Sequence, residues 1–428
     1  MKKVLIQILA VAGFLLAFTS CSDTTIERIT FDANVPVYMS FAEFRSSFKK
    51  SNAEEISQLG KMYFKDGYLF VNDYGKGIHV IDNSDPSNPQ KIAFYEILGN
   101  VDLAIRGNIL FADSYIDLVA IDITDVNNPI EVSRLENVFP EIAPEGDSWY
   151  PYANVDRSKG VIVGWEVKTV TEDREVSRYG SWFYKGEFLT MDAANSGSPG
   201  WSGGTGVGGS MARFMLNQEY LYVIAIPSRL KTVNTSTVES MVVIDSVDIP
   251  RNMETLFMLE DKLFIGTTTG MLIFGLENPG VPRQISAYDH ITACDPVVVD
   301  GQFAYVTLRS GNNCNNAQNL LEVIDISSIE HPFLVKSYPM YNPHGLGVDE
   351  NLLFICDGDA GLKIYDKSDP LQIHMNQLKH YPDFNTYDVI PFGGVLMMVG
   401  AEGIYQYDYS DPGNITQISF ISVAGDKR

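Results

Sequence analysis

The sequence is poor in the residues that carry chemistry and positive charge. Only four of its 428 residues are cysteine and six are histidine, while 31 lysines and arginines stand against 54 aspartates and glutamates. The formal net charge of −23 would repel the phosphates of nucleic acids, so we expect no nucleic-acid partner. Hydrophobic residues make up 45% of the chain, which excludes a disordered protein.

Long apolar runs are also scarce, and the clearest one begins the chain. Lys2 and Lys3 precede an apolar stretch from Val4 to Phe18, which is too short to span a bilayer comfortably. Small residues then lead to Cys21, a pattern that resembles the bacterial lipobox. The resemblance implies a lipoprotein signal peptide over 1–20 and lipidation of Cys21. We therefore expect an envelope protein held in the lipid bilayer by its acylated Cys21, in the outer membrane and exposed at the cell surface. An ordinary signal peptide and an inner-membrane location stay open.

Two short segments follow the signal peptide. Residues 21–35 are polar and are interpreted as a tether. Residues 36–57 are interpreted as an N-terminal helical or closing segment, because Ser40 and Glu43 could form a capping box. The alternative for this segment is a strand that closes the fold.

An internal repeat dominates the remainder, residues 58–428. Its main unit is a short apolar strand ending in Asp, followed by a turn rich in Ser, Asn and Pro. Eight copies occur, at 78–89, 118–129, 188–199, 241–250, 271–282, 321–332, 362–373 and 404–415. A second strand, opened by a Gly, Asn or Asp turn, precedes each copy, as in DGYLFVND and GNILFADS.

The spacing of the repeats predicts an all-β fold. Successive copies lie about 47 residues apart, which is typical of the four-stranded blades of a β-propeller. We therefore predict a single β-propeller of eight four-stranded blades, with seven blades as the fallback, and a short N-terminal helix. The step from Ile244 to Phe274 is short and predicts a stunted outer strand in the fourth blade. An irregular aromatic and Gly-rich insertion is expected at about 140–210.

The repeated aspartates favour turn chemistry over metal binding. An Asp followed by Ser, Asp or Asn can accept hydrogen bonds from nearby backbone N–H groups in an Asx turn. No histidine spacing typical of a metal site occurs in the sequence, so neither a metal nor another cofactor is predicted.

The cores VAID and VVID, followed by Ser or Thr and then Asp-x-x-Asn-Pro, resemble the LVIVD-repeat family of bacterial and archaeal surface proteins. The resemblance implies a surface-anchored propeller and carries no catalytic motif.

The blade alignment places a polar ring at one mouth of the channel, where propellers commonly bind ligands. Its members would be Lys61, Asp102, Asn154, Arg213, Thr255, Pro296, Gly345 and Asp388. The expected ligand-binding residues at this mouth are Asp102, Asp295, Arg309, His344 and Asp388. A solvated mouth whose charges neutralise one another is the alternative.

The four tryptophans gather in the irregular insertion. Trp149, Trp165, Trp182 and Trp201 could form an aromatic platform for a sugar ring or a protein partner, or could simply pack the insertion. Cys294 and Cys314 flank the first two strands of one expected blade and are predicted to form a disulfide, while Cys356 in LLFICDG is expected to be a buried thiol. Three free thiols are the alternative.

Two functions follow from these patterns. The preferred one is a surface-anchored binding module for a glycan or an envelope protein. The alternative is a carbohydrate-active or other hydrolase that uses carboxylates at the mouth, such as Asp102, Asp295 and Asp388.

Overall fold

The computed structural model describes residues 24–140, 142–177, 189–190, 207–210, 212–289, 296–310 and 318–424. These residues belong to two compact units. Residues up to Met39, together with the segment that begins at Glu145 and ends at Phe188, form the smaller unit, and the other residues form the larger one. Within the described ranges, no helix has the length and apolarity needed to cross a bilayer.

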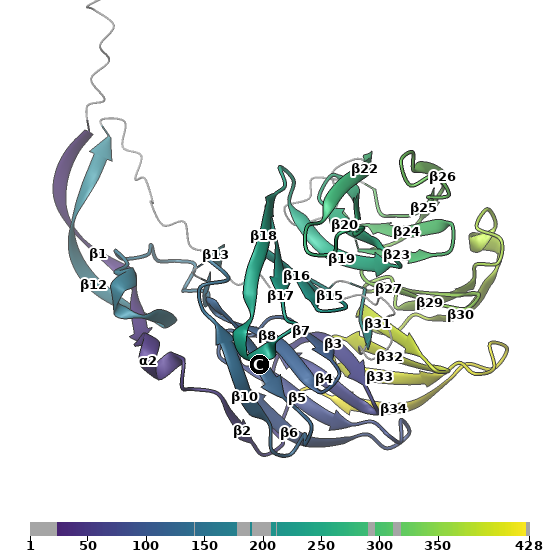
Figure 1. Ribbon diagram of the computed structural model, residues 1–428, viewed down its shortest axis with the longest axis horizontal. Coiled ribbons are helices and arrows are strands. Elements are labelled where there is room, and N and C mark those ends of the chain that lie inside the picture. The colour runs from purple at the N-terminus through teal and green to yellow at the C-terminus, as the bar shows by residue number, and fades with distance from the viewer. Residues whose placement is uncertain are drawn as a thin grey trace, which may run out of the picture. The chain divides into compact units, whose positions relative to one another are not determined.

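The larger unit is a β-propeller of seven blades, each an antiparallel sheet of four strands in sequence order (Figure 1). The innermost strands are β3 (Leu59–Lys65), β7 (Leu103–Arg106), β15 (Phe214–Asn217), β19 (Met253–Leu259), β23 (Val297–Asp300), β27 (Leu346–Asp349) and β31 (Thr386–Phe392). The second strands are β4 (Tyr68–Asp73), β8 (Ile109–Ser114), β16 (Tyr220–Ile226), β20 (Lys262–Thr267), β24 (Phe303–Leu308), β28 (Leu352–Cys356) and β32 (Val395–Gly400).

The third and fourth strands complete each blade. The third strands are β5 (Gly77–Asp82), β9 (Asp117–Asp122), β17 (Arg229–Asn234), β21 (Gly270–Gly275), β25 (Leu320–Asp325), β29 (Leu362–Asp366) and β33 (Gly403–Asp408). The outermost are β6 (Gln90–Glu96), β10 (Ile130–Leu135), β18 (Val242–Asp248), β22 (Arg283–Asp289), β26 (Phe333–Pro339), β30 (Gln377–Tyr381) and β34 (Thr416–Ser422). Smaller elements are 3-10 turns at Arg157–Lys159, Val238–Ser240 and Ile373–Met375, and the parallel pair β11 (Ile142–Ala143) and β13 (Leu189–Thr190).

The prediction of eight blades is wrong, and the fallback of seven is the one observed. The second strand expected before the copy at 188–199 is KGVIVGWE, residues 159–166. This segment belongs instead to β12 (Val161–Ser177), which pairs with β1 (Thr24–Met39) in the smaller unit and not with a blade. Runs of β-branched and aromatic residues identify a strand but not its partner, which explains the miscount.

A second correction concerns the repeat at 241–250. Val242 to Asp248 form the fourth strand of their blade, β18, and the third strand is β17, where Asn234 stands in place of the usual Asp. The repeat was therefore assigned one strand too late, which shortens the step to the next copy. The outer strand of this blade is β18 itself, which has seven residues and is not stunted.

The smaller unit is a two-stranded antiparallel ribbon. Its register runs from Thr24 opposite Ser177 to Met39 opposite Val161, so a strand occupies most of the segment expected to be a tether. Cross-strand side-chain contacts stabilise one face. They join Arg28 to Asp173 (2.8 Å), Thr30 to Thr171 (2.8 Å) and Thr169 to Asp32 (2.6 Å).

The expected N-terminal helix is reduced to the single turn α2 (Phe41–Phe44). The Ser40 hydroxyl accepts a hydrogen bond from the Glu43 N–H at 3.2 Å, as the capping pattern predicts, but the helix extends no further. Instead β2 (Lys49–Ser51) pairs with the outer strand β6 and adds a fifth strand to the edge of the first blade. An outer-edge strand thus forms where the sequence favoured a helix.

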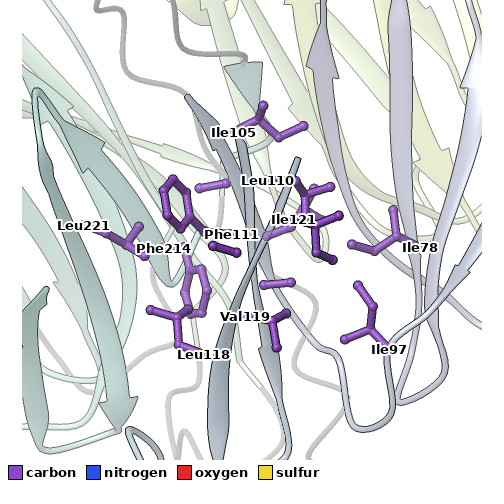
Figure 2. Packing of buried hydrophobic residues seen from close by; sticks show 14 of the residues in the cluster. Ile78, Ile97, Ile105, Leu110, Phe111, Leu118, Val119, Ile121, Phe214 and Leu221 are labelled. Carbon is purple, nitrogen blue, oxygen red and sulfur yellow. The ribbon is translucent and has the colours of Figure 1, made fainter. Parts of the chain in front are cut away.

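Hydrophobic side chains between neighbouring blades form the core. Figure 2 shows Phe111 and Phe214 from adjacent blades packed among aliphatic residues such as Leu110 and Leu221. The junction of the last and first blades has its own cluster, which includes Met62, Ile81, Ile390 and Met397. The ring closes there without exchange of a described strand between the two blades, because the four blade strands are β3–β6 in the first and β31–β34 in the last.

A short segment from the middle of the chain supports this junction. Strand β14 (Val207–Gly208) pairs with β3 on the inner side of the first blade and also contacts β31 of the last blade. The propeller is therefore closed from within by residues that lie between its second and third blades in the sequence.

Candidate functional site at the channel mouth

The innermost strands bring a ring of residues to one end of the propeller, as the sequence predicts. Its described members are Lys61 on β3, Thr255 on β19 and Asp388 on β31, together with Asp102, Arg213, Pro296 and Gly345, which lie directly before β7, β15, β23 and β27. The eighth expected member, Asn154, belongs to the smaller unit. Asp295 lies outside the described residues.

Lys61 and Asp102 form a buried ion pair between the first two blades. The Lys61 Nζ donates to Asp102 Oδ2 at 2.5 Å, and both residues are at most 6% exposed. The same oxygen accepts the backbone N–H of Arg213 from the third blade at 2.7 Å. Burial lowers the pKa of the Lys61 ammonium. The pair therefore joins three blades and leaves little of Asp102 for a ligand.

Asp113, on β8 behind Asp102, is similarly enclosed. Its Oδ1 accepts the backbone N–H groups of Val101 and Asp102 at 2.8 and 2.9 Å and the Asn100 amide at 2.8 Å. Burial raises the pKa of this carboxyl to about 6. These bonds fix the loop that presents Asp102.

Asp388 is covered by the segment that follows β14. Its Oδ1 accepts both the backbone N–H and the hydroxyl of Ser210 at 2.9 Å, and the Ser210 Oγ in turn accepts the N–H of Leu346 at 2.6 Å. Ser210 is fully buried. Burial raises the pKa of Asp388 to about 7. The end of the glycine-rich run thus links the sixth and seventh blades, a role that sequence reasoning missed.

Two glycines allow this close approach. A Cβ at Gly209 would lie 2.0 Å from an Asp388 oxygen, and a Cβ at Gly345 would lie 2.2 Å from the other. The pair of glycines before Ser210 was the signal in the sequence, since Gly is favoured where two backbones or a backbone and a carboxylate come together. From the sequence alone, this pair is interpreted only as part of the irregular Gly-rich insertion.

Arg309, which follows β24, and His344, which precedes β27, lie at the same mouth on the fifth and sixth blades, respectively. His344 is 6% exposed, and its backbone carbonyl accepts the Thr307 hydroxyl at 2.6 Å. Its ring meets that of Tyr387 edge-on, with centroids 5.5 Å apart. Burial and the nearby Arg309 guanidinium lower the pKa of His344 to about 3, so the ring is neutral.

The aromatic platform is only partly described, because Trp182 and Trp201 lie outside the described residues. Trp165 packs against Tyr152, with ring centroids 4.6 Å apart. Trp149 is 88% exposed and lies in a turn where its backbone N–H donates to Asp147 Oδ1 at 2.9 Å. Of the two described tryptophans, Trp165 therefore packs against another ring, whereas Trp149 is exposed to solvent.

Asn34 on β1 holds the turn that displays Trp149. Its side-chain amide donates to the carbonyls of Asp147 and Tyr150, and its Oδ1 accepts the Asp147 N–H. Its backbone N–H donates to Pro151, and its carbonyl accepts the N–H of Ala153. Asn34 is 1% exposed, and nothing in the local sequence indicated this role.

The turn interpretation of the repeated aspartates is confirmed. Asp82, Asp366 and Asp408 each accept both the N–H and the hydroxyl of the serine two residues later. The serine hydroxyl bond is the main reason why the pKa of each of these carboxyls is lowered. No cluster of three or more potential metal-ligating side chains occurs in the described ranges.

Of the four cysteines, only Cys356 lies within the described residues. Cys356 is a free, fully buried thiol on β28, as expected, and burial raises its pKa. Cys21, Cys294 and Cys314 lie outside the described residues, so lipidation and the disulfide stay predictions.

Comparison with known proteins identifies the repeat. The LVIVD repeat model matches residues 63–96, within the first blade, and residues 292–339, around the fifth. A comparison with characterised proteins gave no sequence match.

Solved structures of other propellers resemble the chain at low identity. The computationally designed protein Ika8 is 9% identical over 87% of this chain and 91% of its own, with a TM-score of 0.50. BamB from Moraxella catarrhalis is 9% identical over 90% of this chain and 96% of its own, with a TM-score of 0.46. Hsv2 from Kluyveromyces lactis is 10% identical over 72% of this chain and 74% of its own, with a TM-score of 0.39. At this identity the likeness to Ika8 concerns the fold alone.

Proposed function

Because the chain contains LVIVD repeats within a seven-bladed β-propeller, we propose that it is a binding module of the cell envelope. In this proposal the acylated Cys21 anchors it in a lipid bilayer, at the outer membrane and exposed at the surface. Its partner is a glycan or an envelope protein, and the displayed Trp149 is a principal contact residue.

The exposure of Trp149 on a fixed turn is the observation that carries the proposal. An indole that is 88% exposed leaves a large apolar area in water, and burial of such an area is favourable in a complex. The hydrogen bonds of Asn34 order the turn before any partner arrives, which reduces the entropy lost on binding. Tryptophan is also among the residues that contribute most to binding energy at interfaces.

A binding screen tests this role. The soluble chain from residue 22 onward would be screened against glycans and envelope proteins, and the partner found would be measured again with Trp149→Ala. We expect that variant to bind at least tenfold more weakly. The matched control is Ile26→Ala, which removes a side chain that is 74% exposed in the same unit. Equal affinity of Trp149→Ala and the unmodified chain would refute the assignment of Trp149.

The anchor has its own test. Replacement of Cys21 by Ser should move the full-length protein from the membrane fraction to the soluble fraction. Unchanged membrane association of the Cys21→Ser variant would refute the anchor without affecting the binding role.

No described feature favours the hydrolase alternative. Asp102 and Asp388, two of its three carboxylates, are 3% and 6% exposed and are hydrogen-bonded within the chain. A glycosidase needs a pair of carboxyls in an open cleft that admits the sugar.

A further inference from the structure

Two side chains at the channel mouth have hydrogen-bond donors for which the described residues supply no acceptor. The Asn342 side-chain amide donates to His344 Nε2 at 3.3 Å, so the neutral ring carries its proton on Nδ1. That Nδ1 is buried and has no hydrogen-bond partner among the described residues. A buried donor in this state is costly and requires an explanation.

Arg309 is the second donor. Its side chain is half-buried, and burial lowers the pKa of its guanidinium. No hydrogen bond or ion pair joins its guanidinium to another described residue, and the charge of Glu254 opposes the effect of burial on its pKa. Thr307, two residues before Arg309, donates its hydroxyl to the His344 backbone carbonyl at 2.6 Å, which brings the end of β24 beside His344. The Arg309 guanidinium accordingly lowers the pKa of the His344 ring. An arginine side chain that pairs with no described carboxylate is unusual in a chain with a net charge of −23.

We propose that Arg309 and His344 form a binding site for a carboxylate group of a ligand. The planar guanidinium can donate two parallel hydrogen bonds to the two oxygens of a carboxylate, and His344 Nδ1–H supplies a third donor. The ligand satisfies both orphan donors and neutralises the half-buried charge. The site lies on the propeller, does not involve Trp149 and does not depend on the function proposed above.

The test measures binding of small carboxylates to the soluble chain from residue 22 onward. Acetate probes the shared chemistry, D-glucuronate against D-glucose probes an acidic sugar, and N-acetylalanine against its amide probes a peptide C-terminus. We expect at least one carboxylate to bind and to shift the ring ¹⁵N signals of His344, while its neutral counterpart does not. The stronger of the two larger probes identifies the source of the group.

Substitutions of Arg309 and His344 test whether these two residues bind the carboxylate. Arg309→Gln should weaken binding about tenfold or more, because a hydrogen-bonded charge is lost, and His344→Phe should weaken it by about two- to tenfold. The matched control is Arg229→Gln, whose arginine is already paired with Asp248 at 2.6 Å and should not matter. If Arg309→Gln does not fold, Arg309→Lys retains the charge, loses the fork and should bind more weakly. The proposal is overturned if none of the three carboxylates binds, or if neither Arg309 variant weakens binding.

Discussion

Asn83 and Gln406 exchange two side-chain hydrogen bonds across the junction of the first and last blades. The Asn83 amide donates to Gln406 Oε1 at 2.9 Å, and the Gln406 amide donates to Asn83 Oδ1 at 2.7 Å. Both residues are at most 3% exposed. At a junction that no exchanged strand closes, this pair gives two separate sheets a fixed mutual position.

Loss of one partner should therefore destabilise the ring. Asn83→Leu or Gln406→Leu leaves a buried amide without a partner, and each should lower the free energy of unfolding by about 1–3 kcal/mol. The double variant should cost less than the sum of the single variants, because no polar group is then stranded. Denaturant unfolding measures this cycle, with the exposed Gln284→Leu as control. Additive costs would show that the two amides do not act as a pair.

Asp388 should make the stability of the protein depend on pH. Its pKa in the folded state is about 7, against about 3.9 in an unfolded chain. The folded state therefore binds more protons between these values, so the contribution of Asp388 is most favourable below pH ~4 and is lost as the pH rises to 7. Asp388→Asn removes this dependence. Its free energy of unfolding relative to the unmodified protein should rise by a few kcal/mol from pH 4 to pH 7.

The control for that series is Asp383→Asn, which changes an exposed carboxyl near the same strand. Its curve of unfolding free energy against pH should run parallel to that of the unmodified protein. A parallel curve for Asp388→Asn as well would contradict the protonation of Asp388 in the folded state.

Asn34 should control the order of the Trp149 turn without controlling the propeller. Asn34→Ala removes the three side-chain hydrogen bonds to Asp147 and Tyr150. We expect faster amide hydrogen exchange at residues 147–153, with unchanged exchange in the blade strands. Thr30→Ala, which removes one hydroxyl contact on the same strand, is the control. Unchanged exchange of the turn in Asn34→Ala would mean that other contacts order it.

The cysteines should react unequally. We expect mass spectrometry of the unreduced chain from residue 22 onward to find Cys294 linked to Cys314. Cys356 should resist alkylation in the folded state, because it is buried and its thiol pKa is raised, and should react after denaturation. Alkylation of all three thiols in denatured, unreduced protein would reject the disulfide.

The sequence correctly predicts the turns and strands that recur in each repeat. It fails to predict a strand's pairing when the partner strand is distant in the sequence. The turn between the first and second strands has a residue at positive φ in each blade, for example Gly67 and Gly107, so the Gly and Asp turns that opened the second unit were reliable signals. The aspartates were reliable markers of a third strand in most blades, because an Asx turn needs only residues two positions apart, but Asp245 lies on the fourth strand β18. Strand β12 carried the same local pattern but pairs with β1, more than 120 residues away, and local patterns do not encode that distance.

In the candidate site, too, the positions that follow from the repeat were predicted and the contacts between distant segments were not. Alignment of the blades placed Lys61, Asp102 and Asp388 correctly at the inner strands, because those positions follow from the repeat. The alternative of a mouth whose charges neutralise one another anticipated charge pairing in general. The alignment did not identify the Lys61–Asp102 pair or the contact of Ser210 with Asp388, since both join elements of different blades or of an insertion. Asn34 is a single residue without a repeat, and no periodicity could have identified it.

The position of the inner strand β14 in the sequence also affects the order in which parts of the propeller can fold during synthesis. Ser210 is synthesised 178 residues before the carboxylate of Asp388 that holds it. At translation rates of about 5–20 residues per second, the interval is roughly 9–36 seconds. During that time the inner edge of the first blade already has its extra strand available, whereas the last blade does not yet exist. The growing chain can therefore protect the edge at which a stray strand would otherwise add, well before the seventh blade arrives to close the circle.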